Sequence, residues 1–181
     1  MPHRSWTLLA SRYLGDYRVV RLREDRYRFE LSQQEADFIV CESADWALTI
    51  PVTPDGQVVF IRQYRHGQRQ VVLEIPGGVL DNGESPEAAG VRELLEETGY
   101  APGRVRYLGR LMPNPALNSA WCHVVLAEDC HCVSASQPDG LEHLEVELHP
   151  LERIPEMIRS GDLVHAQVIA AFSLWHTLSH G

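Results

Sequence analysis

The stretch from Gly78 to Tyr100 constrains this chain most, because a glycine-bearing loop leads directly into a short acidic helix. The ends of that helix are well marked. Ser85 can accept amide hydrogens of the first turn, Pro86 suits the first helical position, and Gly99 permits a left-handed stop. The sequence therefore predicts a helix over Pro86–Thr98.

The predicted helix gathers carboxylates on one side. At about 100° per residue, Glu93, Glu96 and Glu97 fall within an arc of about 100°. The opposite, apolar side is predicted to pack and consists of Ala88, Val91, Leu94 and Leu95. Like charges four residues apart destabilise a helix by about 0.2–0.5 kcal/mol, and a bound cation would relieve that repulsion. Carboxylate oxygens suit hard ions such as Mg2+ or Mn2+, which often bind together with substrate phosphates, so the cluster indicates phosphate chemistry.

Composition limits the remaining choices. The chain has 181 residues, 44% apolar and 23% charged, which predicts a soluble globular domain with a modest extension. Its net charge of -9 argues against nucleic-acid binding. The longest unbroken apolar run, Val168–Phe172, is too short for a membrane span, and Trp6–Ala10 is too short for a signal-peptide core. Four cysteines without a C-x-x-C pair predict free thiols and a cytoplasmic location: Cys41, Cys122, Cys130 and Cys132.

Strand and helix patterns predict a mixed α/β protein. The predicted strands are Tyr17–Arg23, Arg26–Leu31, Asp37–Glu42, Ala47–Val52, Gln57–Arg65, Val71–Ile75, Val105–Leu111, Trp121–Ala127 and Glu145–His149. Two late helices are predicted over Ile154–Arg159 and Val164–Thr177. Thr53–Gly56 has the residues of a tight hairpin turn, and Glu128–Glu142 is predicted to be a long polar loop.

The acidic segment matches the Nudix box, G-x5-E-x7-R-E-U-x-E-E-x-G-U, where U is a bulky apolar residue. The matching residues are Gly78, Glu84, Arg92, Glu93, Leu94, Glu96, Glu97, Gly99 and Tyr100. Seven fixed letters, each at roughly 5 to 7% abundance, coincide by chance in on the order of one in 10^8 windows. The chain therefore resembles the Nudix hydrolases, with aromatic Tyr100 at a usually aliphatic position as the one mild departure.

Residues outside the box resemble the ADP-ribose pyrophosphatase branch of that family. They are the motifs Arg62–Arg65 and Glu74–Gly78, and Pro115, which lies fifteen residues beyond the box. The resemblance implies an α/β/α sandwich around a mixed sheet over residues 46–181. It also implies a strand-rich N-terminal extension over residues 1–45, through which members of this branch commonly form homodimers.

The resemblance further implies roles for the acidic residues. Glu93 and Glu97 look like direct ligands of Mg2+ or Mn2+, and Glu96 looks like a further ligand. Glu84 is expected as an outer contact of the metal, and the carbonyl of Gly77 as a backbone ligand. Arg92 stands one turn before Glu96, and we interpret its guanidinium as a brace that orients a carboxylate.

Several residues keep two interpretations. Glu142 is the expected general base in the loop, with Glu145 and Glu147 as rivals and a solvated loop charge as the alternative. The substrate-binding hypothesis covers Arg62, Arg65, Trp46, Tyr64 and Pro115. Either arginine can instead pair with a surface acid, and the aromatic side chains are more commonly core than base-stacking. His123, inside an apolar strand, is expected to be a core or dimer-contact residue.

The implied reaction is hydrolysis of a nucleoside diphosphate linked to another group, with ADP-ribose cut to AMP and ribose 5-phosphate. GDP-mannose and other nucleotide sugars are rival substrates. Nucleoside triphosphates and dinucleoside polyphosphates are compatible with the same box. A Nudix module that senses a nucleotide without hydrolysing it is an alternative of another class, because a fold can persist where activity is lost.

Overall fold

A computed structural model describes residues 5–137 and 143–179 and divides the chain into two compact units. One contains the described part of residues 1–44 together with Met112–Trp121, and the other contains Asp45–Leu111 and the described part of residues 122–181. The segment Met112–Trp121 therefore groups with the N-terminal strands although it is distant from them in sequence. It is tied to them by a hydrogen bond from the Cys41 amide to the Leu117 carbonyl, at 2.6 Å.

The N-terminal unit is an antiparallel sheet of order β1-β2-β3. Its strands are β1 (Trp6–Asp16), β2 (Arg21–Phe29) and β3 (Gln34–Glu42). The predicted strand over Tyr17–Arg23 is wrong in its first four residues, because residues 17–20 form the turn between β1 and β2, closed by the Tyr17 amide on the Val20 carbonyl at 2.9 Å. Its last three residues begin β2. The strand that precedes this turn, β1, is not among the predicted strands, although the apolar run Trp6–Ala10 lies within it.

The second unit contains two principal sheets. Their strands are β4 (Trp46–Pro51), β5 (Gln57–Arg65), β6 (Gln70–Glu74), β7 (Gly77–Val79), β9 (Arg104–Leu111), β10 (Cys122–Glu128) and β12 (Leu144–Pro150). One sheet has the order β7-β4-β10-β9 and is mixed, because β4 and β10 run parallel while their outer neighbours are antiparallel. The other has the antiparallel order β12-β5-β6. The short strands β8 (Tyr100–Ala101) and β11 (His131–Cys132) pair separately.

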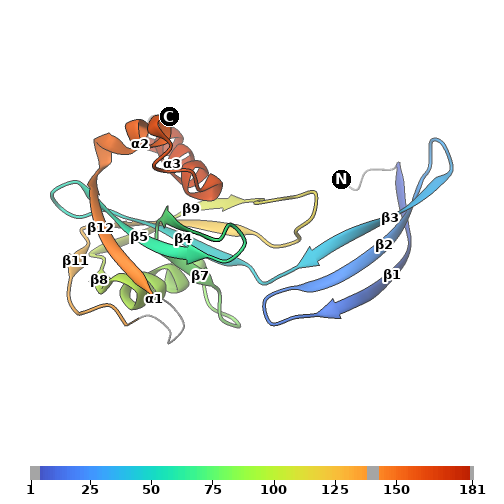
Figure 1. The fold of residues 1–181 in the computed structure, drawn as a ribbon, viewed down its shortest axis with the longest axis horizontal. Helices are drawn as coiled ribbons and strands as arrows, with labels where there is room; N and C mark the ends of the chain where they lie inside the picture. Colours follow the sequence, from blue (N-terminus) through green and yellow to red (C-terminus); the bar gives the residue numbers. More distant parts are fainter. Residues whose placement is uncertain (1–4, 138–142, 180–181) are drawn as a thin grey trace. The chain divides into compact units, whose positions relative to one another are not determined.

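Helices cover both sides of these sheets, with α1 (Pro86–Thr98) on one side and α2 (Ile154–Ser160) and α3 (Ala166–Ser179) on the other (Figure 1). A single-turn 3-10 helix over Leu151–Arg153 leads into α2. This is the predicted α/β/α sandwich, and the fold prediction is confirmed.

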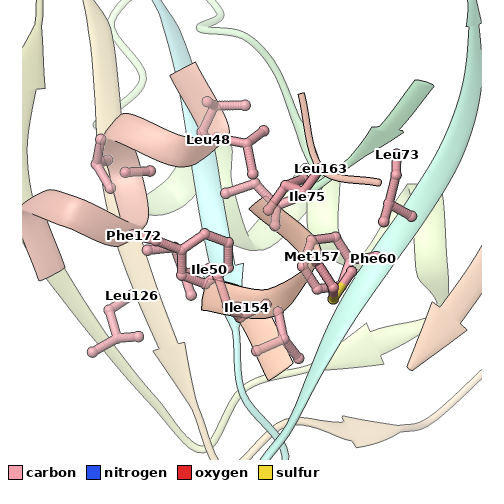
Figure 2. Packing of buried hydrophobic residues seen from close by; sticks show 14 of the residues in the cluster. Leu48, Ile50, Phe60, Leu73, Ile75, Leu126, Ile154, Met157, Leu163 and Phe172 are labelled. Carbon is pink, nitrogen blue, oxygen red and sulfur yellow. The ribbon is translucent and has the colours of Figure 1, made fainter. Parts of the chain in front are cut away.

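The main core lies between the sheets and the two C-terminal helices. Leu48 and Ile50 from β4 meet Phe60 from β5 and Phe172 from α3, and all are buried (Figure 2). Side chains alternate along a strand, so Ala47 and Thr49 face the other side, toward α1. Because both faces of β4 are covered, its sequence is apolar almost throughout, as is typical of a parallel-paired central strand.

Two local predictions need correction. The Thr53–Gly56 turn forms, with the Gly56 amide on the Thr53 carbonyl at 3.0 Å, but the strands it joins separate into different sheets and do not form a regular hairpin. A single bridge, Val52 to Val58, remains between them. Within the predicted loop Glu128–Glu142, residues His131–Cys132 form β11, which pairs with the strand just after α1.

Among residues 5–137 and 143–179, no helix is both long and apolar enough to cross a lipid bilayer.

Candidate active site

Helix α1 occupies the predicted residues and has the predicted ends. The Ser85 hydroxyl accepts the Ala88 amide at 3.2 Å, and Gly99 has φ 75° and donates its amide to the Leu95 carbonyl. The helix lies close to β4, where the Thr49 hydroxyl donates to the Gly90 carbonyl at 3.1 Å. A side chain at Gly90 would collide with Thr49, so glycine is what permits this approach.

The buried side of α1 differs from the prediction. Ala89, Gly90, Leu94, Glu97 and Thr98 are buried, whereas Ala88 and Leu95 of the predicted packing face are exposed. The apolar residues predicted the wrong packing side of the helix, because one of the positions that face the core carries a carboxylate.

That carboxylate belongs to Glu97, a residue that is only 4% exposed. Its Oε2 accepts the amide hydrogen of Gly77, the first residue of β7, at 3.0 Å. A buried carboxylate is strongly disfavoured unless hydrogen bonds or charges satisfy it, and this bond supplies part of that compensation. Glu97 therefore joins the C-terminal half of α1 to the strand that begins the box.

Arg92 is the centre of a network that includes the predicted acidic residues. Its Nε and Nη2 donate to the two oxygens of Glu84 at 3.0 and 2.9 Å, and its Nη1 donates to Glu93 at 2.7 Å. The contact with Glu96, which the sequence suggested, is the longest of these at 3.4 Å. The Arg92 hydrogen bonds and the Asp81 amide hold the pKa of Glu84 below its usual value, so this carboxyl stays ionised.

Glu93 lies directly over Gly78. A Cβ added at Gly78 would overlap the Glu93 carboxylate, so the absence of a side chain there creates the space that the carboxylate occupies. Within the described residues, no three His, Cys, Asp or Glu side chains already converge to hold a metal ion. The glutamate oxygens nevertheless suit a hard divalent cation, and the glycine cradle leaves Glu93 beside the backbone of β7.

The two predicted substrate arginines each pair with an acid. Arg65 donates through Nε and Nη2 to Glu74, both at 2.7 Å, and Arg62 donates to Glu147 at 2.5 and 3.3 Å. Arg62 lies on the face of β5 that carries Phe60, and Arg65 lies on the other face, as alternation along the strand requires.

The rival bases have contrasting surroundings. Glu147 accepts hydrogen bonds from Arg62 and from His149, and these keep its pKa below the usual value. Glu145 has an exposed side chain, 3.8 Å from the exposed His143. Glu142, the expected base, lies outside the described residues.

The remaining predicted contacts are spread over the chain. Trp46 is half-buried against the main core, which favours its core interpretation. Tyr64 is 48% exposed, and its ring forms a T-shaped contact with the ring of His66. Pro115 is exposed in the segment that groups with the N-terminal unit.

The sequence did not predict the polar contacts of His123. His123 is 9% exposed, and its Nδ1 lies 2.9 Å from the Tyr107 hydroxyl while its Nε2 lies 3.4 Å from Asp45. The sequence indicated a core histidine but not its partners, because they depend on the pairing of β9, β10 and β4.

Comparison with known proteins decides the family. A family model described as NUDIX domain matches residues 45–172, which is most of the chain. The chain belongs to the Nudix family. The predicted Nudix hydrolase family is thus confirmed, and the box residues lie inside the matched range.

Individual relatives place this Nudix chain near two kinds of pyrophosphatase. It is 30% identical over 123 residues to the ADP-ribose pyrophosphatase of Bacillus subtilis (strain 168), covering 67% of this chain and 66% of that protein. It is 28% identical over 188 residues to the GDP-mannose pyrophosphatase of Citrobacter koseri (strain ATCC BAA-895 / CDC 4225-83 / SGSC4696), covering 96% of each. A solved structure described as an ADP compounds hydrolase has a TM-score of 0.85 over 97% of this chain and 94% of that chain, at 22% identity, which shows the shared fold.

Proposed function

We propose that this chain is a metal-dependent pyrophosphatase that hydrolyses a nucleoside diphosphate linked to another group, with ADP-ribose as its preferred substrate. The observation that carries the proposal is the acidic network around β7. Glu97 is fixed by the Gly77 amide, Glu93 lies over Gly78, and Arg92 orients both Glu93 and Glu84. Similarity to the Bacillus subtilis ADP-ribose pyrophosphatase supports the substrate class.

The residues that would hold Mg2+ or Mn2+ are Glu93, Glu96 and Glu97, with the Gly77 carbonyl as a backbone ligand and Glu84 as an outer contact. A bound divalent ion polarises phosphoryl oxygens, neutralises the leaving phosphate and lowers the pKa of a water. The chain itself supplies orientation, because Arg92 fixes the carboxylates before substrate arrives. We propose Arg65 as the residue that binds the diphosphate, because a guanidinium recognises phosphate oxygens through two parallel hydrogen bonds.

The same proposal includes the kind of partner and a cytoplasmic location. The substrate is a small molecule, and nucleic-acid or membrane partners are not part of it. The four cysteines are all described and none forms a disulfide, which fits a reducing cytoplasm.

A substrate panel tests the proposed reaction. We expect purified protein with Mg2+ to convert ADP-ribose to AMP and ribose 5-phosphate with a higher kcat/KM than GDP-mannose, nucleoside triphosphates or dinucleoside polyphosphates. Mass analysis after reaction in heavy-oxygen water identifies the bond cut and the phosphorus attacked. A higher kcat/KM for GDP-mannose moves the assignment to that substrate, which the Citrobacter koseri relative makes the main rival. Saturable binding without product under Mg2+ or Mn2+ identifies a nucleotide sensor instead.

We also propose that the protein is a homodimer formed through the N-terminal sheet. The two faces of that sheet differ in chemistry. One carries the ion pairs Arg12–Glu24, Arg26–Asp37 and Arg28–Glu35. The other exposes an apolar cluster of Trp6, Leu8 and Phe38, which are 42 to 51% exposed, and further along carries the ion pairs of Arg23 with Asp25 and Glu42. An exposed apolar cluster is typical of an interaction surface, and a second copy would cover it.

Replacing Leu8 in that apolar cluster tests the dimer. Wild-type protein is expected at twice the chain mass in light scattering, and Leu8→Lys is expected to shift it to the monomer mass, because a desolvated charge would oppose association. Arg12→Gln, on the charged face, is the matched control and is expected to stay dimeric. A monomeric wild type, or equal dissociation of both variants, rejects this interface.

A further inference from the structure

Glu74 is a buried acid at the end of β6, three residues before Gly77, and is 1% exposed. Besides Arg65, it faces a residue from a distant part of the chain. His165 immediately precedes α3 and places its Nε2 3.5 Å from Glu74 Oε2. A loop between two C-terminal helices therefore contacts the strand that leads into the acidic site.

The other ring nitrogen of His165 determines which tautomer is present. Nδ1 accepts the Val168 amide at 3.4 Å, in the manner of an N-cap, so Nδ1 carries no proton. The proton of the neutral ring then sits on Nε2, the nitrogen that lies 3.5 Å from Glu74 Oε2. Burial lowers the pKa of His165, against the opposing effect of Glu74, and thus favours this neutral form near pH 7.

We propose that His165 is a positioning residue for the diphosphate site, acting through Glu74 on Arg65. The Glu74 carboxylate accepts two bonds from Arg65, so its orientation sets the orientation of the guanidinium. His165 restrains the same carboxylate on its Oε2 side. This inference rests on the proposed function, in which Arg65 binds the diphosphate.

The alternative is that His165 only caps α3. Two amide side chains separate these roles, because asparagine places its polar atoms near the position of Nδ1 and glutamine places them near the position of Nε2. His165→Asn therefore keeps the cap for Val168 but is too short to reach Glu74. His165→Gln keeps the reach to Glu74 and loses the cap.

The experiment measures kcat, KM and thermal unfolding for both variants, and the Kd of ADP-ribose by calorimetry in EDTA. We expect His165→Asn to raise KM and Kd about three- to tenfold with kcat within about twofold, because a uniform binding interaction is weakened. His165→Gln is expected to restore KM and Kd to within about twofold of wild type while unfolding at a lower temperature.

An Arg65→Lys background tests the route of the effect. Lysine keeps the charge but not the two hydrogen bonds to Glu74, so in this background His165→Asn is expected to raise Kd by less than about twofold. The proposal is overturned if the effects of His165→Asn and Arg65→Lys on Kd are fully additive, or if His165→Asn leaves Kd unchanged. It is also overturned if the rise in Kd follows the fall in unfolding temperature in both His165 variants.

The Kd measurement also separates this inference from the proposed function. If wild type binds ADP-ribose in EDTA but does not cut it when Mg2+ is supplied, the hydrolase proposal fails while the two His165 variants still decide the positioning role. If wild type does not bind ADP-ribose in EDTA, the Arg65 diphosphate site fails, and the His165 proposal fails with it even where hydrolysis with Mg2+ is seen.

Discussion

Glu97→Gln is expected to lower kcat/KM by on the order of 10^3-fold while leaving the protein folded. Glutamine keeps the volume of the side chain, and its Oε1 can still accept the Gly77 amide that Glu97 accepts at 3.0 Å. The change removes the negative charge and replaces one carboxylate oxygen with an NH2 group, and the affinity for a hard divalent ion depends on both. Steady-state kinetics over a range of Mg2+ and Mn2+ concentrations, with circular dichroism as the check of folding, measure the effect.

Glu96→Gln provides the matched comparison within the same helix. Its side chain is 50% exposed and touches Arg92 at 3.4 Å, so it is less enclosed than that of Glu97. We expect a smaller loss, about tenfold, together with a weaker apparent affinity for the metal. Full activity of folded Glu97→Gln, or equal losses in the two variants, contradicts the assignment of Glu97 as a principal ligand.

The helix boundaries were predictable because local chemistry sets them. Ser85, Pro86 and Gly99 act within one turn of their own positions, and all three do in the structure what their residue types suggest. The buried side of the same helix was not predictable from its apolar residues. Leu95 is exposed and Glu97 is buried, and part of what compensates the buried carboxylate is the Gly77 amide, twenty residues away in sequence.

Partners that depend on tertiary structure were also missed. Nothing local in the sequence indicates that His165 approaches Glu74, since ninety residues and a change of layer separate them. The same holds for the Thr53–Gly56 turn. Its residue types predicted the turn correctly, but they did not predict that the two strands it joins enter different sheets. Turn chemistry fixes a local reversal, but the sheet that each strand joins depends on which neighbours bury its faces.

Alanine at the two adjacent glycines of β7 is expected to have different effects, lowering stability at Gly77 and activity at Gly78. At Gly77 a Cβ would overlap the backbone carbonyl of Ala47 on the paired strand and approach Leu48 Cδ2 at 2.8 Å. Backbone in a central strand cannot move aside cheaply, so Gly77→Ala is expected to destabilise the protein by about 3 kcal/mol. That corresponds to a fall in Tm of roughly 6 to 12 °C in a chain of this size, measurable by calorimetry.

At Gly78 the obstructing atoms belong to the end of the Glu93 side chain, which can rotate away. Gly78→Ala is therefore expected to keep its stability within about 1 kcal/mol of wild type, since only a flexible group moves. Activity responds instead, with kcat/KM lower by about 10- to 100-fold, because the displaced Glu93 carboxylate no longer lies over the β7 backbone. Comparing the two variants by calorimetry and kinetics separates packing from chemistry at neighbouring positions. A Gly78→Ala protein that is fully active would mean that the placement of Glu93 over β7 does not matter to the reaction.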